Sequence, residues 1–276
     1  MKSSLSGQEC DAFDFVASLR VTSQLAQEQV FRDYLILLPW LANSLLLSII
    51  IHPSMANLRR PRCIIGVGKN YPDLINELEG EHPQYPEMFF KNPASVIGNG
   101  EPIVISPIAS TPEMGLDYEG ELAVVLGRDV RDVAESEALS AISHLAVAND
   151  VSQRWWQNYN GGGQWCRAKS FDTFCPLSEL VPITAVHDIQ NLQLETRLNG
   201  ELVQQANTSS MIFTVASLIA QLSAGTTLLE GTVILTGTPG GLGMNRTPMR
   251  FMRPGDVVEV SIEGVGQLRN PVVEQN

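Results

Sequence analysis

The chain has 276 residues, of which 44% are hydrophobic and 17% are charged, as is typical of a globular protein with a sizeable core. Its net charge of −12 and isoelectric point of about 4.8 argue against a surface that binds nucleic acid or an anionic membrane. The cysteines show no Cys-x-x-Cys spacing, which indicates neither a zinc cluster nor a disulfide framework and favours reduced thiols in the cytoplasm.

Residues 1–58 are predicted to form a separate, partly helical appendage. Apolar residues recur near helical spacing within 8–38, and the chain carries no charge over 34–51. A membrane-spanning helix needs about 20 apolar residues. This run is short and is interrupted by a proline and polar residues, so we expect a buried helix pair or an interface element instead. It also begins too late in the chain for a signal peptide. Residues 59–276 form the second predicted domain.

The second domain opens with a predicted strand over 64–67, which leads into a polar segment that extends to Lys91. Prolines and a glycine interrupt this segment, and a short helix is expected at about 73–79. Lys91 stands at the end of the next strand. It either binds an anionic group of a substrate or is an ordinary surface lysine.

Two glutamates stand at the centre of the stretch 114–127. Glu119 and Glu121 are separated by one residue in a run with strand character, so their carboxylates are expected on one face of the strand. Two carboxylates on one face repel each other and need a positive partner. A hard divalent cation with oxygen ligands meets this need. The alternatives are an exposed polar strand face and neutralisation by lysine or arginine.

A third carboxylate ends the next apolar run, residues 142–150. Asp150 in this position either caps a helix or supplies a third metal ligand. Arg154 and Gln157 follow four and seven residues later and share a helical face. The alternative to a binding role is an ordinary exposed helix face. Lys169 lies among apolar and small residues, and it either takes part in chemistry or forms a structural salt bridge.

The remainder of the chain is mainly β in character. Asn199-Gly200 between two alternating stretches indicates a hairpin, a helix is expected over 209–224, and the C-terminal stretch forms a last hairpin. A buried strand runs into a glycine-rich loop at Thr238, which is either an oxyanion-binding loop or a plain tight turn. Many strands with non-local pairing and few helices indicate an α+β, mainly β fold, a mixed β-roll or sandwich, with the N-terminal appendage partly helical.

An ordered series of motifs resembles the fumarylacetoacetate hydrolase family and covers residues 62–274. The set in this order is more specific than any one motif. The resemblance implies the β-roll of the family's C-terminal domain. With the apolar run at 35–51, it also implies a homodimer. The motifs are GVGKNY (66–71), FFKNPAS (89–95), DYEGELAVVLG (117–127), ND with R and Q following (149–157), KSFDTFCP (169–176), LNGELVQQANTSSMIF (198–213) and TGTPGGLG (236–243).

In the family, the segment after the first strand is a lid over the substrate. Its histidine and glutamate are thought to activate the water for hydrolysis. Here Leu74 stands at the histidine position, while Glu77 keeps the glutamate. Leucine cannot act as a base, so this pair is incomplete. His82 in the same segment is either a substitute base or a solvent-exposed histidine, and we expect the latter.

The resemblance and the carboxylates together indicate an enzyme that acts on a 2-oxo or 1,3-diketo acid through a metal-bound enolate. The small carboxylic acid is the expected partner. The expected ligands of Mg²⁺ or Mn²⁺ are Glu119, Glu121 and Asp150. The expected catalytic residues are Lys169 and Glu77, and the expected substrate-binding residues are Arg154, Gln157, Thr238 and Lys91.

Three functions remain open at this point. The first is an acylpyruvate-type hydrolase that breaks a C–C bond. The second is an oxaloacetate-type decarboxylase or enol–keto tautomerase, and tautomerisation suits Leu74 better because it needs only the metal and a proton relay. The third is a non-catalytic scaffold, against which the retained charged cluster argues.

Overall fold

The computed structural model describes residues 60–109, 115–158 and 161–275. All of these belong to the second of the two units into which the chain divides, Ser54–Asn276. The predicted helices and the apolar run of residues 1–58 lie outside the described residues. No helix in the described ranges is long and apolar enough to cross a membrane.

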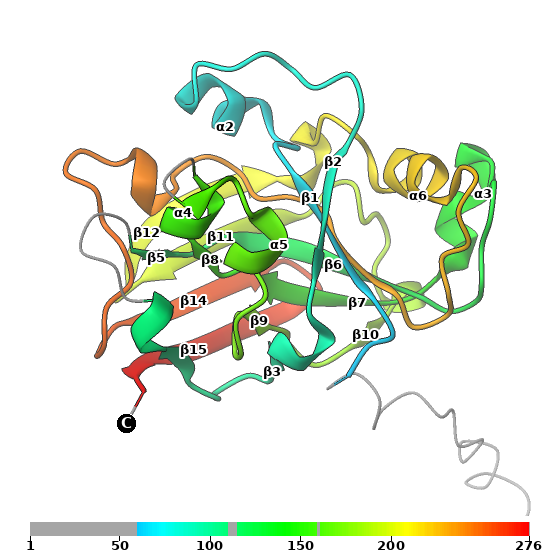
Figure 1. The fold of residues 1–276 in the computed structure, drawn as a ribbon. Helices are drawn as coiled ribbons and strands as arrows, with labels where there is room; N and C mark the ends of the chain where they lie inside the picture. The colour runs from blue at the N-terminus through cyan, green and yellow to red at the C-terminus, as the bar shows by residue number, and fades with distance from the viewer. Residues whose placement is uncertain (1–59, 110–114, 159–160, 276) are drawn as a thin grey trace, which may run out of the picture. The chain divides into compact units, whose positions relative to one another are not determined.

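Two mixed sheets form the framework (Figure 1). Most neighbouring strands are antiparallel, whereas β1 pairs with β13, and β15 with β4, in parallel. The six-stranded sheet has the order β10 (Val181–Pro182), β7 (Ile142–Asn149), β6 (Gly120–Leu126), β13 (Val233–Leu235), β1 (Ile64–Gly68) and β2 (Glu87–Lys91). The five-stranded sheet has the order β12 (Glu201–Asn207), β11 (Gln193–Leu198), β14 (Val257–Ile262), β15 (Gly266–Glu274) and β4 (Ile103–Ile105).

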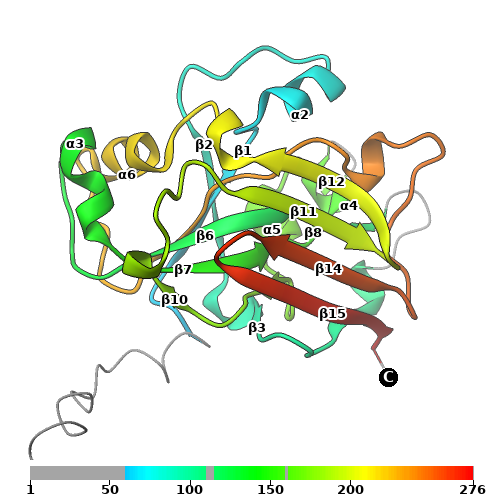
Figure 2. The ribbon, with the colours of Figure 1, turned by 180° about the vertical axis from the view of Figure 1, so that it is seen from behind.

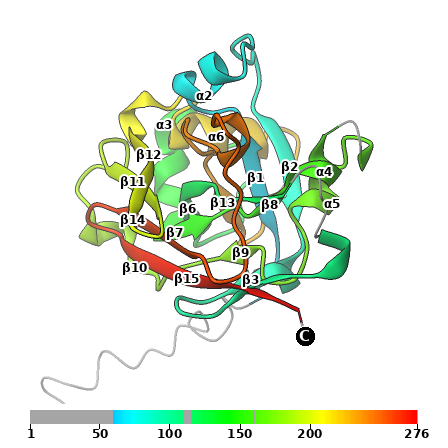
Figure 3. The same cartoon turned by 90° about the vertical axis from the view of Figure 1, so that its left-hand side faces the viewer.

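Short elements complete this part of the chain. The five-stranded sheet faces the viewer in Figure 2, whereas in Figure 3 α2 lies above the sheets and α4 and α5 lie opposite the five-stranded sheet. The two small sheets pair β3 (Val96–Ile97) with β9 (Cys175–Pro176) and β5 (Leu116–Asp117) with β8 (Ser152–Gln153). The helices are α2 (Pro72–Glu77), α3 (Glu135–Ala138), α4 (Arg154–Gln157), α5 (Trp165–Ala168) and α6 (Val215–Ser223), with 3₁₀ turns at Pro93–Ser95, Pro107–Ala109, Leu139–Ala141, Ile183–Ala185, Thr208–Ser210 and Gly243–Asn245.

Strand β6 is buried on both faces, and its side chains alternate between two core clusters. Leu122, Val124 and Leu126 pack in the cluster that also holds residues of α6 and of the five-stranded sheet. Ala123 and Val125 pack in a second cluster with residues of β7 and β13. Glu121 in this strand and Glu119 directly before it therefore sit in a buried environment, where an uncompensated charge is costly.

The predicted fold class, an α+β, mainly β fold of the β-roll type, is confirmed. The hairpin forms where Asn199-Gly200 predicted it, with Leu198 opposite Glu201 and both turn residues at positive φ. The helix expected over 209–224 begins only at Val215. The backbone N–H groups of Ile212 and Phe213 instead donate to the backbone oxygen and side-chain oxygen of Asn70, so this segment is held by a distant residue.

Candidate active site

Three carboxylates meet where β6 begins and β7 ends. Gly120 lies opposite Asn149, and the Asp150 N–H donates to the Glu119 carbonyl at 2.8 Å, so the two strand ends are locked together. One oxygen from each of Glu119, Glu121 and Asp150 lies within 4.8 Å of the others, and all three residues are at most 6% exposed. The alternation of side chains and the end of the apolar run indicated this grouping from the sequence.

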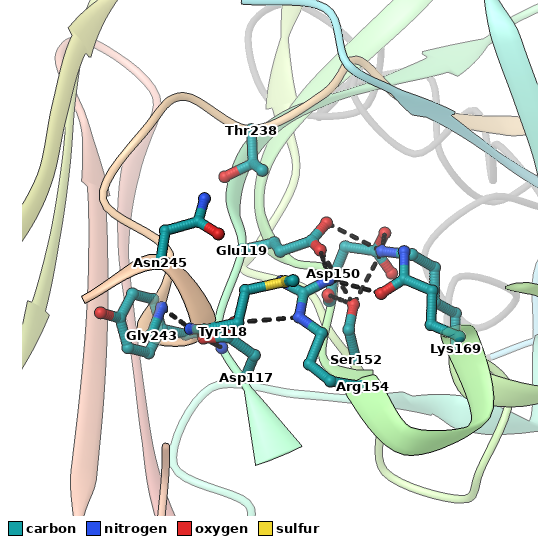
Figure 4. Close-up of polar contacts among 12 residues, drawn as sticks. Asp117, Tyr118, Glu119, Asp150, Ser152, Arg154, Lys169, Thr238, Gly243 and Asn245 are labelled. Carbon is teal, nitrogen blue, oxygen red and sulfur yellow. Dashed lines mark hydrogen bonds and ion pairs between the residues drawn. The ribbon is translucent and has the colours of Figure 1, made fainter. Parts of the chain in front are cut away.

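Two buried lysines neutralise part of this charge. The ammonium of Lys169 lies 2.8 Å from Glu119 and 2.6 Å from Asp150, and it donates to the Ser152 hydroxyl at 2.7 Å (Figure 4). Lys91 donates to the other Asp150 oxygen at 2.5 Å. The structure therefore places Lys91 inside the cluster, where it is 2% exposed, and not at a surface.

Arg154 extends the network in the other direction. Its Nε donates to Asp117 at 2.9 Å, and its Nη1 lies 2.7 Å from Glu119 and 2.6 Å from the Gln157 side-chain oxygen (Figure 4). Its Nη2 is buried and has no hydrogen-bond partner among the described residues. A buried guanidinium N–H without an acceptor is costly, and a carboxylate is the acceptor that best suits it.

The surroundings shift the pKa values of Glu121 and Glu119 in opposite directions. Burial raises the pKa of Glu121 well above its usual range, and the charges of Asp150 and Glu119 raise it further. Burial also opposes the charge of Glu119, but the ammonium of Lys169 and the guanidinium of Arg154 outweigh burial and lower that pKa to about 2. Glu121 is in no ion pair within the described ranges, so it is the carboxylate whose charge is least compensated.

Lys169 is held as an ammonium. Burial favours the neutral amine, but the carboxylates of Asp150 and Glu119 outweigh it and raise the Lys169 pKa above its ordinary value. An ammonium in this state stabilises nearby negative charge well and is a poor general base.

The donor set of the cluster fits a hard divalent cation. Its three ligands are carboxylates, which Mg²⁺ and Mn²⁺ prefer, and their oxygens are close enough to converge on one ion. The raised pKa of Glu121 points the same way, because a bound cation would stabilise its charged form.

The glycine-rich loop after β13 closes one side of the cluster. The Gly237 N–H donates to Glu121 at 2.7 Å, and the Thr238 hydroxyl donates to the Gly120 carbonyl at 3.0 Å. Gln204 donates to the Thr238 hydroxyl at 2.8 Å and accepts from the Gly120 N–H at 3.0 Å. The Gly237 N–H, one of the backbone donors predicted to bind an oxyanion, thus holds the carboxylate of Glu121, a predicted metal ligand.

A cavity of about 170 Å³ opens beside the cluster. Five of the predicted site residues line it, whereas Glu121, Asp150, Lys91 and Glu77 do not. Lys169 and Arg154 in its wall are at most 2% exposed, whereas Leu78 is 36% exposed, and Lys69 and Asn158 also line it. The predicted site residues in the wall are Glu119, Arg154, Gln157, Lys169 and Thr238, and the apolar residues are Val67, Leu74, Leu78, Trp165, Leu242 and Met244.

Helix α2 covers this cavity with leucines and binds the glycine-rich loop with carboxylates. Leu74 is buried in the cavity wall. Glu77 accepts from the Gly241 N–H at 2.7 Å and from the Asn245 side chain at 3.0 Å. His82 lies in the exposed loop that follows the helix. The structure therefore brings Leu74 to the cavity and places Glu77 against the loop instead.

Comparison with known proteins identifies the family. The model of the fumarylacetoacetate (FAA) hydrolase C-terminal region matches residues 63–273. This chain belongs to the fumarylacetoacetate hydrolase family. The predicted membership, and with it the prediction of an enzyme, is confirmed.

Several relatives within the family carry isomerase or tautomerase names, and one solved structure is named as a fumarylacetoacetate hydrolase. The chain is 40% identical over 220 residues to the mitochondrial oxaloacetate tautomerase fahd2 of Xenopus laevis, which covers 79% of this chain and 68% of that protein. Human mitochondrial oxaloacetate tautomerase FAHD2A is also 40% identical over 220 residues, covering 79% and 69%. The crystal structure of 5-carboxymethyl-2-hydroxymuconate delta-isomerase from Mycobacterium smegmatis superposes with a TM-score of 0.68 at 38% identity, covering 79% of this chain and 80% of that one.

Several residues of this family member's network were not anticipated from the sequence. Asp117 stands two positions before Glu119, as Glu121 stands two after it, so the same alternation could have indicated a third acidic side chain on this face. Ser152 stands two positions after Asp150 and gave a comparable signal. Gln204 gave none, because its role depends on a contact between two sheets.

Proposed function

We propose that this protein is a divalent-metal-dependent enol–keto tautomerase that acts on a 2-oxo acid. The observation that carries the proposal is the complete carboxylate cluster with Lys169, which lies beside the cavity. Helix α2 presents Leu74 to this cavity, at the position where hydrolysis would need a base. The names of the relatives support the same reaction class. The hydrolase interpretation, which the sequence alone placed first, is less well supported than this alternative.

The chemistry requires only the movement of protons. The enol O–H loses its proton, the C–O bond becomes a carbonyl, and the neighbouring carbon gains a proton, so the formula of the acid does not change. When bound, a divalent cation held by Glu119, Glu121 and Asp150 would supply a Lewis acid that stabilises negative charge on a substrate oxygen.

The residues of the chain orient the substrate and stabilise its charge. The Lys169 ammonium faces the cavity and stabilises negative charge that develops on the substrate. Arg154 and Gln157 line the same wall, and the unpartnered Nη2 of Arg154 suits a substrate carboxylate. Leu74 and Leu78 limit the access of water, which would protect a reactive enol from side reactions.

The apolar residues of the cavity wall favour a substrate with a carbon chain beyond its 2-oxo acid group. Leu74, Leu78, Leu242 and Met244 would pack against such a chain, in a wall that also includes Lys69 and Asn158. Burying a methylene group contributes about 0.8 kcal/mol, or roughly fourfold in affinity. A series of 2-oxo acids of increasing chain length should therefore show KM falling by about this factor with each added methylene, until the cavity is filled.

A substrate panel tests the proposed reaction. Enol forms of oxaloacetate and of longer 2-oxo acids, together with acylpyruvates, are incubated with the protein and Mg²⁺ or Mn²⁺, and the products are identified by NMR. The proposal predicts keto isomers as the main products. Cleavage of an acylpyruvate into two acids as the dominant reaction would favour the hydrolase instead.

We also propose that the enzyme is a homodimer. Met88 and Phe90 on the edge strand β2 are 47% and 49% exposed, and Tyr85 nearby is 75% exposed, which is apolar surface that a second subunit could cover. A monomer mass in light scattering at micromolar concentration would contradict this.

The described cysteines Cys63, Cys166 and Cys175 are free thiols. Since the frog and human relatives are named as mitochondrial, the cytoplasm stays a prediction.

A further inference from the structure

Asp117 is a fully buried carboxylate that accepts four hydrogen bonds. Its Oδ1 accepts from the N–H groups of Tyr118 at 3.0 Å and Gly243 at 2.8 Å. Its Oδ2 accepts from the Arg154 Nε at 2.9 Å and the Met244 N–H at 3.1 Å. The side chain is 0% exposed and does not line the cavity, so it has no access to a substrate (Figure 4).

These contacts fix the orientation of Arg154. A guanidinium is planar, so binding its Nε and its Nη1 determines where Nη2 points. Asp117 binds Nε, while Glu119 and Gln157 bind Nη1. Nη2 is left without a partner among the described residues, on a side chain that lines the cavity and is 2% exposed.

The same carboxylate fixes part of the cavity wall. Gly243 and Met244 follow Leu242, and both Leu242 and Met244 line the cavity. The loop approaches Asp117 so closely that a Cβ on Gly243 would lie 2.7 Å from Oδ1. Asp117 thus holds in place both Arg154 and the loop segment at Gly243 and Met244.

We propose that Asp117 is a positioning residue, which holds the guanidinium of Arg154 in the cavity wall so that its positive charge acts on a carboxylate of the substrate. This inference rests on the proposed function for the identity of the substrate, but its central measurement is a binding measurement. Oxalate serves as the probe, because it carries the adjacent carboxylate and oxygen of a 2-oxo acid.

Asp117→Asn is the decisive variant. Asparagine keeps an oxygen for Tyr118 and Gly243 but turns an NH₂ group toward the two donors on Oδ2, Arg154 Nε and Met244 N. Hydrogen bonds to a charged group are worth enough that we expect oxalate to bind about tenfold to hundredfold more weakly in the presence of Mg²⁺. KM for the 2-oxo acid should rise by a similar factor, with a smaller change in kcat.

A matched control separates positioning from general stability. Asp256 is also a buried loop aspartate with four donors, namely both terminal nitrogens of Arg250, the Arg253 N–H and the Asn199 side chain, but none of these lines the cavity. Asp256→Asn should lower the melting temperature and leave oxalate affinity unchanged. Calorimetric affinity for Mg²⁺ should be the same in the wild type and in Asp256→Asn.

A double-mutant cycle provides the test that a purely structural role would not pass. If Asp117 acts through Arg154, Asp117→Asn should weaken oxalate binding less than twofold in an Arg154→Lys background. An undiminished effect in that background, equal losses in the two Asp→Asn variants, or no oxalate binding by the wild type would overturn the inference. So would failure of both Asp117→Asn and Asp117→Ser to fold. Failure of the proposed function would show separately, as an absence of isomerisation with oxalate binding retained.

Discussion

The buried carboxylate cluster and the lid helix α2 both present acidic side chains to the same glycine-rich loop, but in different surroundings. In the cluster, Glu119 and Asp150 are buried against lysine and arginine. In the lid, Asp73 and Glu77 are exposed and accept the N–H groups of Gly240 and Gly241 at 3.0 and 2.7 Å. Buried charges act strongly on a neighbouring substrate, whereas exposed carboxylates that bind backbone N–H groups mainly hold a loop in place. We therefore assign the chemistry to the cluster and the fastening of the loop to the lid.

Disabling the cluster should have the largest effect. Treatment with EDTA should abolish isomerisation, and Mg²⁺ or Mn²⁺ should restore it. Glu121→Gln should reduce kcat/KM by about 10³-fold or more, because a Lewis acid supplies several kcal/mol of charge stabilisation. Glu259→Gln is the control and should retain full activity, because this glutamate of β14 pairs with Arg269 of β15 and not with the cluster. Metal-independent turnover by the wild type would contradict the assignment.

Removing the ammonium from the cluster should come next. Lys169→Met should lower kcat about 10²-fold, since the charge that stabilises the developing anion is lost in a buried site. Because its pKa is raised, Lys169 stays protonated at neutral pH and below. Titration of this residue should therefore cause no fall in activity as the pH is lowered through neutrality. A pH–rate profile with a lysine that must lose its proton near pH 7 would show that it acts as a base instead.

Changing the lid carboxylate should have a much smaller effect. Glu77→Gln can still accept from the Gly241 N–H, so we expect less than about a threefold change in isomerisation, against the 10²–10⁴-fold expected for a general base. Gly240→Ala provides the contrast, because its Cβ would lie 2.6 Å from the Glu77 Oε1, so that the Glu77 carboxylate would have to shift. A loss above 10²-fold in Glu77→Gln, with metal affinity unchanged, would assign the chemistry to the lid.

The histidine of the lid segment should matter least. His82→Ala should leave both isomerisation and acylpyruvate hydrolysis within about twofold of the wild type, since His82 is exposed in the loop after α2. Leu74→His should raise hydrolysis above the wild-type level, because it places a base in the cavity wall. A strong loss of hydrolysis in His82→Ala would identify that residue as the substitute base.

The same two regions show what the sequence could and could not predict. Residues close in sequence, such as Glu119 and Glu121, were placed on one face by the period of a strand, and the strand end at Asp150 followed from an apolar run. Contacts between distant segments had no such signal. Lys91 to Asp150 joins residues 59 apart, and Glu77 to Gly241 joins residues 164 apart. These contacts follow from how β2, α2 and the glycine-rich loop pack, which no local pattern specifies.

We assign the chemistry to the carboxylate cluster and not to the lid. The ratio of two rates, measured in one sample of the wild-type protein with Mg²⁺, tests this assignment most directly. The first rate is the conversion of the enol form of a 2-oxo acid to its keto form, followed by the loss of enol absorbance. The second is the cleavage of an acylpyruvate, followed by NMR of the products. We predict that isomerisation exceeds cleavage by at least about 10²-fold, the smaller end of what a missing general base costs. Cleavage at an equal or higher rate would contradict the account.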